Sequence, residues 1–423
     1  MYQLTQLPSG IKVVSGLMQG RQSIGIGVWA KVGARFENKK NSGISHCLEH
    51  MLFKGTKHRS TRKIKEDVEG VGGVMNAFTS EESTCYFVKI TNEHQEQAFD
   101  VLADMVNHAS LKAAEFAREK TVILEEIKMY LDLPSHQVHE LINELMWPEQ
   151  PLGRPIAGTE SSVTGIQAQD LKRYMGLYYK PQNLVVSFCG QSPHDEVCDW
   201  VKDRFQHKGA FRAQSFLKAE SSQKKPRFHL LNKKTEQMHF VIGFHGLYKN
   251  HPHRYQLGVL NVILGANMSS RLFEEVREKR GLAYEIKSGL AFFEDTGAVG
   301  ISAGVEPKKA ALATRVIMRE LKRLKQTLVS RDELRRAKDY YIGQLRMGLE
   351  DTLDHMLWIG ERCLYRNELP DQNKIIQEIE AVSADDVQIL AKRLFRTKGV
   401  NLALIGQFDK SFEKQMQQEC DCD

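Results

Sequence analysis

The stretch from Ile24 to Ala30 reads I-G-I-G-V-W-A, and the stretch from Phe240 to Gly246, 216 residues further on, reads F-V-I-G-F-H-G. Both are short apolar runs of the kind that forms a buried β-strand. The same offset relates Leu171 to Val387 and Gln191 to Gln407. Three anchors at one spacing indicate that a domain of about 200 residues, a normal domain size, has been duplicated.

The pattern around the first anchor gives the order of elements in one copy. We expect strands at 11–17, 23–32, 74–79, 84–90 and 184–188, and helices at 41–54, 61–68, 93–108, 112–130, 135–147, 168–178 and 194–205. This order predicts an α+β fold of two duplicated domains, each an antiparallel or mixed sheet packed with helices. We expect a first domain at 1–208, a linker at 209–226 that is rich in Ser, Gln and Lys, and a second domain at 227–423.

The composition excludes several classes of protein. The chain has 423 residues, 41% of them hydrophobic, and a formal charge of +6. Its densest basic run, 224–227, lacks the interleaved aromatic residues of a nucleic-acid groove, so no nucleic-acid partner is expected. No run of 18 apolar residues and no signal peptide is found, so we expect no membrane association and a cytoplasmic location. Seven scattered cysteines without a C-x-x-C pair are typical of reduced thiols.

A chemically distinctive segment follows the first two predicted strands. The letters from Ser45 to Met51 read S-H-C-L-E-H-M within a segment that has helical periodicity, for which Asn41 or Ser42 is the expected N-cap. On a helix, residues three and four apart share a face, so the two histidines and the glutamate of H-x-x-E-H project together. Two imidazoles one turn apart can hold one metal ion, with the carboxylate beside the remaining coordination positions.

H-x-x-E-H is the inverted counterpart of the H-E-x-x-H motif of zinc peptidases. A chance pair of histidines would give the same letters, so the interpretation depends on a third ligand, which a catalytic zinc ion requires. The predicted helix 112–130 carries Glu115, Glu119, Glu125 and Glu126. Glu119 and Glu126 are two turns apart and share a face, but the spacing alone leaves Glu125 and Glu126 both open as the ligand.

The second copy of the repeat lacks this chemistry. At the offset of 216, the residues of the motif correspond to Val262, Gly265 and Ala266, none of which binds metal. The sequence therefore predicts that one domain carries the reaction and that the other supports it or helps to hold a substrate.

Five segments together resemble one family. They are G-x-x-H-C-L-E-H-M-L-F-K-G-T at 43–56, G-G-x-x-N-A-F-T at 72–79, the run 119–126, L-G-x-x-I-x-G at 152–158, and 269–284, which contains S-S-R-L-F and R-E-K-R-G-L-A-Y. In these segments the chain resembles the pitrilysin/insulysin family of zinc metallopeptidases, the inverzincins. The similarity covers about 10–408 and is greatest to the bacterial processing proteases that are like the mitochondrial processing peptidase.

The resemblance implies a Zn²⁺ site and roles for the residues around it. The metal ligands would be His46, His50 and Glu126. Glu49 would be the catalytic base and Glu119 an assisting carboxylate.

The resemblance also implies residues that bind the substrate. Asn76 and Ala77, on an exposed edge strand, would meet the backbone of the peptide. Arg277 and Tyr284 of the second domain would reach its carbonyl groups, and Tyr284 would thereby assist the reaction.

The sequence thus predicts a zinc-dependent endopeptidase that hydrolyses peptides or leader segments held in extended form inside a clamshell chamber. The resemblance implies that two such two-domain chains face each other, so we expect a homodimer or a heterodimer with a related subunit. The alternative function is that of a non-catalytic assembly or regulatory subunit of a processing-peptidase-like complex. The zinc-binding residues degrade in such subunits, whereas here His46, Glu49, His50 and Glu126 are all present.

Overall fold

The structure is a computed structural model that describes residues 2–206, 215–366 and 368–421. The chain forms two compact units. The first contains Met1–Ile127, Arg154–Leu217 and Arg346–Asp371, and the second contains Lys128–Gly153, Lys218–Leu345 and Gln372–Asp423. Each predicted domain thus supplies most of one unit and one segment of the other. Of the predicted linker at 209–226, residues 209–214 lie outside the described part of the chain.

The first unit is built on a six-stranded sheet with the order β1-β2-β6-β3-β5-β4. Its strands are β1 (Tyr2–Gln6), β2 (Lys12–Leu17), β3 (Ser23–Ala30), β4 (Val74–Thr79), β5 (Thr84–Thr91) and β6 (Leu184–Gly190). β2 and β6 are parallel, and the other neighbouring strands are antiparallel. β3, which contains the opening I-G-I-G-V-W-A run, is almost wholly buried because it lies inside the sheet.

The second unit repeats this topology in a five-stranded sheet with the order β7-β11-β8-β10-β9. Its strands are β7 (Arg227–Asn232), β8 (Met238–His245), β9 (Ala283–Phe292), β10 (Gly297–Val305) and β11 (Asn401–Gly406). β7 and β11 are again the parallel pair, and the other pairs are antiparallel. The strand order confirms the predicted duplication and the α+β class. In the described residues, β1 has no counterpart in the second sheet.

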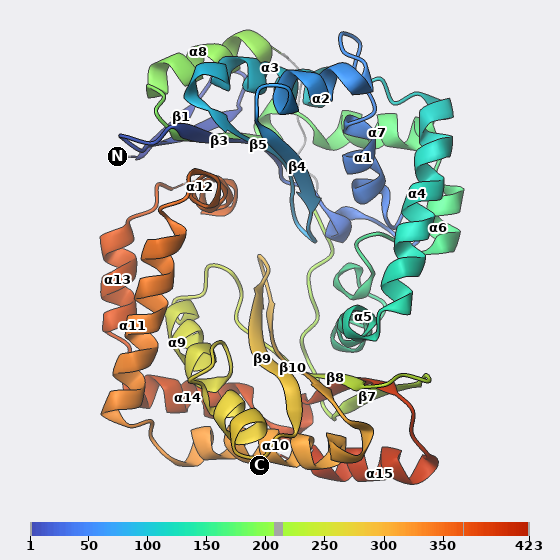
Figure 1. Ribbon diagram of the computed structural model, residues 1–423, viewed down its shortest axis with the longest axis vertical. Helices are drawn as coiled ribbons and strands as arrows, with labels where there is room; N and C mark the ends of the chain where they lie inside the picture. The colour runs from blue at the N-terminus through green and yellow to red at the C-terminus, as the bar shows by residue number, and fades with distance from the viewer. Residues whose placement is uncertain (1, 207–214, 367, 422–423) are drawn as a thin grey trace. The chain divides into compact units, whose positions relative to one another are not determined.

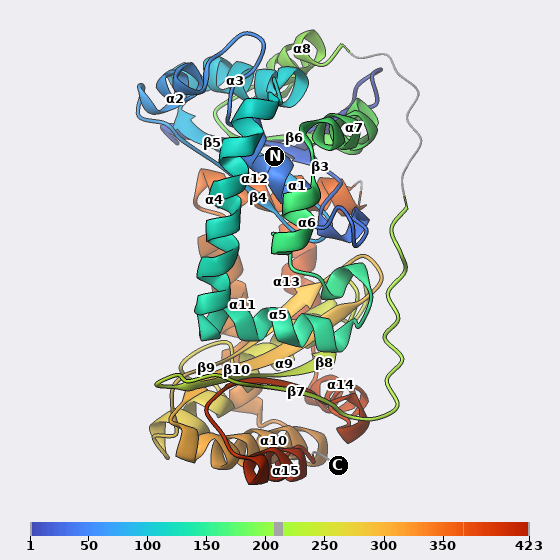
Figure 2. The ribbon, with the colours of Figure 1, turned by 90° about the vertical axis from the view of Figure 1, so that its right-hand side faces the viewer.

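Helices cover both faces of the first sheet. α3 (Gln95–His108) and α8 (His194–Arg204) lie on one face, and α12 (Thr352–Arg366) lies on the other (Figures 1 and 2). α12 packs across β3 and β6 and closes an apolar cluster that contains Trp29, Cys85 and Met356. The unit also contains α1 (Ile44–Leu52), α2 (Thr61–Glu69), α6 (Glu160–Gly165), α7 (Ala168–Tyr178) and most of α4 (Ala113–Asp132).

The second sheet is covered in the same way. α5 (Pro134–Met146) packs across β8 and β11 on one face, and α10 (Ala310–Gln326) and α14 (Ala384–Leu394) lie on the other (Figure 2). The remaining helices are α9 (Arg254–Leu264), α11 (Arg331–Gly348), α13 (Gln372–Glu380) and α15 (Lys410–Glu419). α5 precedes the second sheet in the chain, whereas α12 comes after most strands of the second sheet but covers the first. The two halves therefore exchange one helix each.

None of the helices in the described residues combines the length and the hydrophobicity that crossing a membrane requires.

The close approach of α12 to the first sheet requires glycines. A Cβ on Gly27 of β3 would lie 2.5 Å from Sδ of Met356, and a Cβ on Gly360 of α12 would lie 2.3 Å from Nε1 of Trp29. The Trp29 indole donates a hydrogen bond to Ser187 from this packed position, so it is not free to move away. Helix and sheet therefore touch at a distance that a larger side chain would increase.

We expect Gly360→Ala to destabilise the first unit by about 1–3 kcal/mol, because overpacking forces the buried indole or the helix to shift. The measurement is the midpoint of thermal or chemical unfolding. Gly176→Ala is the matched control, because Gly176 is an exposed glycine of α7 at which an added Cβ would meet no other part of the chain within 4 Å. The control variant should be as stable as the unchanged protein or slightly more stable. Equal stability of both variants would contradict the close packing of α12.

Candidate metal centre

The H-x-x-E-H segment forms α1, as predicted. Its apolar side chains recur at helical spacing and are buried in the core of the first unit: Ile44, Cys47, Leu48, Met51 and Leu52. Burial of this stripe fixes the rotation of the helix about its axis. The opposite face, which carries His46, Glu49 and His50, is therefore presented beside β4 and is only partly buried.

The expected N-cap of α1 was wrong. The helix is capped neither by Asn41 nor by Ser42 but begins after Gly43, which has a left-handed conformation with φ 91°. The carboxylate of Glu37 instead accepts hydrogen bonds from the backbone N–H groups of Gly43 (2.7 Å) and Ser45 (2.9 Å). A carboxylate also favours the positive end of the helix dipole, so Glu37 replaces the short capping side chain.

A second glycine holds the start of α1 in place. A Cβ on Gly158 would lie 2.4 Å from the carbonyl oxygen of Ser42, and a Cβ on Gly43 would lie 2.5 Å from that of Ala157. Both glycines have positive φ, which other residues rarely adopt. The glycine that ends the L-G-x-x-I-x-G segment is thus required for the backbone of that segment to pass directly over the first turn of α1.

α4 supplies the carboxylates. Its buried face contains Phe116, Ile123 and Ile127, and Glu119 is buried among them. Glu126 is half-buried next to this face, whereas Glu125 is exposed. Of the two candidates that the spacing left open, the structure places Glu126 with the histidines, and its part as a ligand stays a prediction.

His46, His50 and Glu126 come together as one group of potential ligands. Nε2 of His46 lies 3.8 Å from Oε1 of Glu126, and Nε2 of His50 lies 3.5 Å from Oε2 of the same carboxylate. One potential ligand atom from each residue lies within 4.8 Å of the other two. Two imidazole nitrogens and a carboxylate oxygen are a ligand set that suits Zn²⁺.

The protonation of the imidazoles fits this use. Burial and the neighbouring His50 lower the pKa of His46 to about 4, so His46 is neutral at pH 7 and has a lone pair to give. Burial also lowers the pKa of His50, but hydrogen bonds to Glu126 and Glu119 outweigh it, and the net shift is upward. A cation bound by Nε2 of His50 would take the place of a proton on that nitrogen.

Glu119 orients His50. Its Oε1 lies 2.9 Å from Nδ1 of His50, and its Oε2 lies 2.6 Å from Nζ of Lys54. A carboxylate that accepts from Nδ1 fixes the proton there and directs the lone pair of Nε2 toward Glu126. Sequence reasoning did not single out Lys54, although its position four residues after His50 was a signal that it lies on the same side of the segment.

Glu49 is held from the neighbouring strand. The hydroxyl of Thr79, the last residue of β4, donates to Oε2 of Glu49. Burial raises the pKa of Glu49, and the hydrogen bond from Thr79 opposes this shift. A carboxylate with a raised pKa, beside a ligand group, is suited to accepting and returning a proton near neutral pH. The sequence contained no spacing signal for Thr79.

β4 is an edge strand, as predicted. Asn76 is exposed, and its Oδ1 accepts a hydrogen bond of 2.8 Å from the backbone N–H of Ala77. The N–H of Ser80 donates to the carbonyl of Ser83. In the alternating antiparallel register, Ala77 and Tyr86 then form a non-hydrogen-bonded pair, so the N–H of Ala77 points toward the open edge. A main-chain edge of this kind can add an extended peptide as a further strand.

Arg277 and Tyr284 lie next to each other in the second unit. The guanidinium of Arg277 is 5.1 Å from the centre of the Tyr284 ring, and Tyr284 is 78% exposed at the start of β9. The structure thus brings this predicted pair together, and its part in substrate binding stays a prediction.

In the described part of the second unit, no comparable ligand group is found. Among the described residues, both groups of three or more potential ligands belong to the first unit. α9, which follows β8 as α1 follows β3, contains no His, Cys, Asp or Glu. The predicted loss of metal chemistry from the second copy agrees with this composition.

The comparisons with known proteins agree with this asymmetry. Residues 12–160 match the model of the insulinase family (peptidase family M16), and residues 165–341 match the model described as the peptidase M16 inactive domain. The chain belongs to the insulinase family. It is 39% identical to the "uncharacterized zinc protease YmxG" of Bacillus subtilis, over 94% of this chain and 96% of that protein. It is 36% identical to a Streptomyces coelicolor protein also named an uncharacterized zinc protease, over 95% and 89% of the two chains.

Two solved structures have the same fold. A protease from Helicobacter pylori superposes with a TM-score of 0.91 at 24% identity, covering 96% of this chain and 99% of the other. A Pseudomonas fluorescens structure, described as a peptidase M16 inactive domain, gives a TM-score of 0.87 at 17% identity, covering 97% and 98%. At these identities the likeness establishes the fold alone.

Loss of the Glu119 carboxylate should weaken metal binding. We expect Glu119→Gln to lower zinc affinity by about 10- to 100-fold, because His50 loses a charged acceptor and Lys54 loses its partner. The measurement is competition against a chromophoric chelator. Glu115→Gln, one turn earlier on α4, is the control and should bind zinc normally. If Glu119→Gln retains full affinity, Glu119 does not orient a ligand.

Proposed function

We propose that the protein is a zinc-dependent endopeptidase that cleaves peptides bound in extended form. The observation that carries this proposal is the convergence of His46, His50 and Glu126 within 4.8 Å, with Glu49 on the same helical face. The zinc-protease names of the relatives support the same reaction class. The proposal gives the first unit the chemistry and leaves the natural substrate open.

The chain's own residues have separable tasks in this reaction. His46, His50 and Glu126 would hold the zinc ion, and Glu119 with Lys54 would keep His50 in the ligating tautomer. When bound, zinc supplies Lewis-acid chemistry, which lowers the pKa of water and polarises a carbonyl group.

Glu49 would take a proton from the attacking water and deliver it to the departing amine. Burial raises the pKa of Glu49, which makes it a stronger base than an ordinary solvated carboxylate. The hydrogen bond from Thr79 occupies one carboxylate oxygen and leaves the other for the water. Thr79 is thus a positioning residue that links the base to the strand proposed to bind substrate.

The open edge of β4 would hold the substrate. A peptide paired with β4 lies extended, and the connection from Thr79 to Glu49 fixes the distance from that strand to the base. Asn76 and Ala77 would contact the backbone of the peptide. Arg277 and Tyr284 are proposed to bind carbonyl groups of the substrate, on the strength of the family resemblance.

We expect Glu49→Gln to reduce kcat by about 10²–10⁴-fold while zinc binding persists, because Gln accepts no proton. The measurement is digestion of a mixed peptide library with cleavage sites identified by mass spectrometry, together with the zinc content of each variant. Glu125→Gln is the control, since this neighbour of Glu126 is an exposed carboxylate of α4. Equal cleavage by Glu49→Gln and by the unchanged protein would show that Glu49 is not the catalytic base. Absence of cleavage by every form would favour the non-catalytic alternative.

A substitution that removes the backbone N–H of Ala77 tests whether the substrate pairs with the edge of β4. We expect Ala77→Pro to lower kcat/KM by about tenfold or more through a raised KM, because proline removes the N–H that faces the open edge. The N–H of Ala77 is not paired with β5, so the sheet should persist. Ala77→Ser retains the N–H and should cleave almost normally. Similar KM values for the two variants would show that substrate does not pair with this edge.

A further inference from the structure

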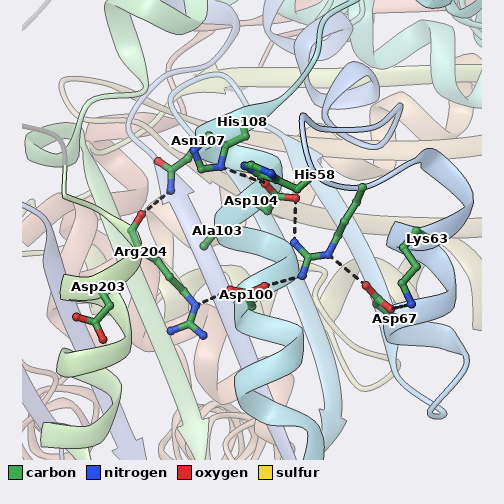
Figure 3. A pocket seen from close by; sticks show the side chains of 11 residues that line it. His58, Lys63, Asp67, Asp100, Ala103, Asp104, Asn107, His108, Asp203 and Arg204 are labelled. Carbon is green, nitrogen blue, oxygen red and sulfur yellow. Dashed lines mark hydrogen bonds and ion pairs between the residues drawn. The ribbon is translucent and has the colours of Figure 1, made fainter.

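A second group of potential metal ligands lies outside the proposed catalytic centre. His58 is in the loop between α1 and α2, and Asp104 and His108 are one turn apart at the end of α3. Nδ1 of His108 lies 3.1 Å from Oδ1 of Asp104, and Nε2 of His58 lies 4.0 Å from the same oxygen. Figure 3 shows the three side chains close together, and one potential ligand atom from each lies within 4.8 Å of the others.

The backbone that carries these side chains is fixed on both sides. Thr56 pairs with Ala109 in an antiparallel bridge. The N–H of Lys57 donates to the carbonyl of His108 (2.9 Å), and the N–H of Ser110 donates to that of Gly55 (3.0 Å). The loop that carries His58 is thus attached to the end of the helix that carries His108. This backbone pairing holds the two imidazoles together, with their ring centres 4.8 Å apart.

Asp104 is oriented as a ligand would be. It is 6% exposed, and its Oδ2 accepts hydrogen bonds from the hydroxyl of Thr56 (2.6 Å) and from Nη1 of Arg59 (2.9 Å). These bonds fix the carboxylate and leave Oδ1 facing the two histidines. Support of a ligating carboxylate by such hydrogen bonds is typical of metal sites.

The charges around the group favour a cation. Three cationic and four anionic side chains line the adjacent cavity of about 580 Å³: Arg59, Lys63 and Arg204, and Asp67, Asp100, Asp104 and Asp203. Arg59 is bonded to three of these carboxylates, so its charge is compensated within the cluster. Lys63 and Arg204 are likewise paired with carboxylates, so an anion would have to break an ion pair to reach any of these three cations. The carbonyl end of α3 adds partial negative charge beside His108.

We propose that His58, Asp104 and His108 bind a second divalent transition-metal ion. Two imidazoles and one carboxylate select ions such as Zn²⁺, Co²⁺ or Ni²⁺ rather than Mg²⁺ or Ca²⁺. The imidazole of His58 is exposed and that of His108 is partly exposed, so water completes the coordination and the ion exchanges readily. Because the ligands come from a loop and a helix, the ion cross-links 55–59 to α3 and stabilises that connection.

The test counts zinc ions in the full-length chain. Protein stripped by a chelator is dialysed against buffered free Zn²⁺ of increasing concentration, and bound metal is measured by mass spectrometry. We expect two ions for the unchanged protein, one for His58→Gln/His108→Gln, and one for His46→Gln/His50→Gln. His251→Gln/His253→Gln is the matched control, because this pair has rings 5.3 Å apart but belongs to no three-ligand group in the described residues. It should bind two ions.

A spectroscopic readout separates this site from the catalytic one. Co²⁺ added to His46→Gln/His50→Gln should give visible ligand-field absorption, and the further change His58→Gln should weaken binding at least about tenfold. Wild-type stoichiometry in His58→Gln/His108→Gln, or no metal on His46→Gln/His50→Gln, overturns the proposal. Failure of the proposed peptidase appears instead as equal cleavage by Glu49→Gln, so the two failures are distinguishable.

Discussion

The site depends on one contact, in which Glu126 of α4 faces the two imidazoles of α1. By themselves, these side chains place a carboxylate against His46, which is neutral at pH 7, and against His50, whose pKa the hydrogen bonds to Glu126 and Glu119 raise. A divalent ion would compensate the carboxylate and take the imidazole lone pairs at once. Much of the first unit serves to keep α1 and α4 at this separation.

Side-chain packing and helix capping hold α1 in position relative to α4. The apolar stripe of α1 fixes its rotation, and Glu37 with the glycines at 43 and 158 fixes where it begins. On α4, Glu119 is buried on the same face as the apolar residues, so packing of that face into the core also brings the carboxylate to His50. The packing that buries this face of α4 therefore also sets the position of Glu119 beside His50.

The exchange of α5 and α12 joins the two halves more closely than a linker does. α12 completes the core of the first unit, so the sheet beside the candidate metal centre is one that the carboxyl-terminal half of the chain helps to bury. A fragment that ended near residue 208 would expose Trp29 and Cys85, and its failure to cleave would not report on the second unit's role in the reaction. Each half of the chain thus completes the core of the other half's sheet, although in the described residues both groups of potential ligands lie in the first unit.

The sequence by itself determined the duplication, the class of fold, the positions of most strands and helices of the first half, and the face shared by His46, Glu49 and His50. These follow from local periodicity, which each segment carries independently of its neighbours. Only the tertiary structure showed that Glu126 rather than Glu125 contacts the histidines, replaced the expected caps by Glu37, and assigned α12 to the first sheet. It also brought His58 to Asp104 and His108. The physical reason is that these relations join residues far apart in the chain, and the distances between such residues are set by packing rather than by spacing.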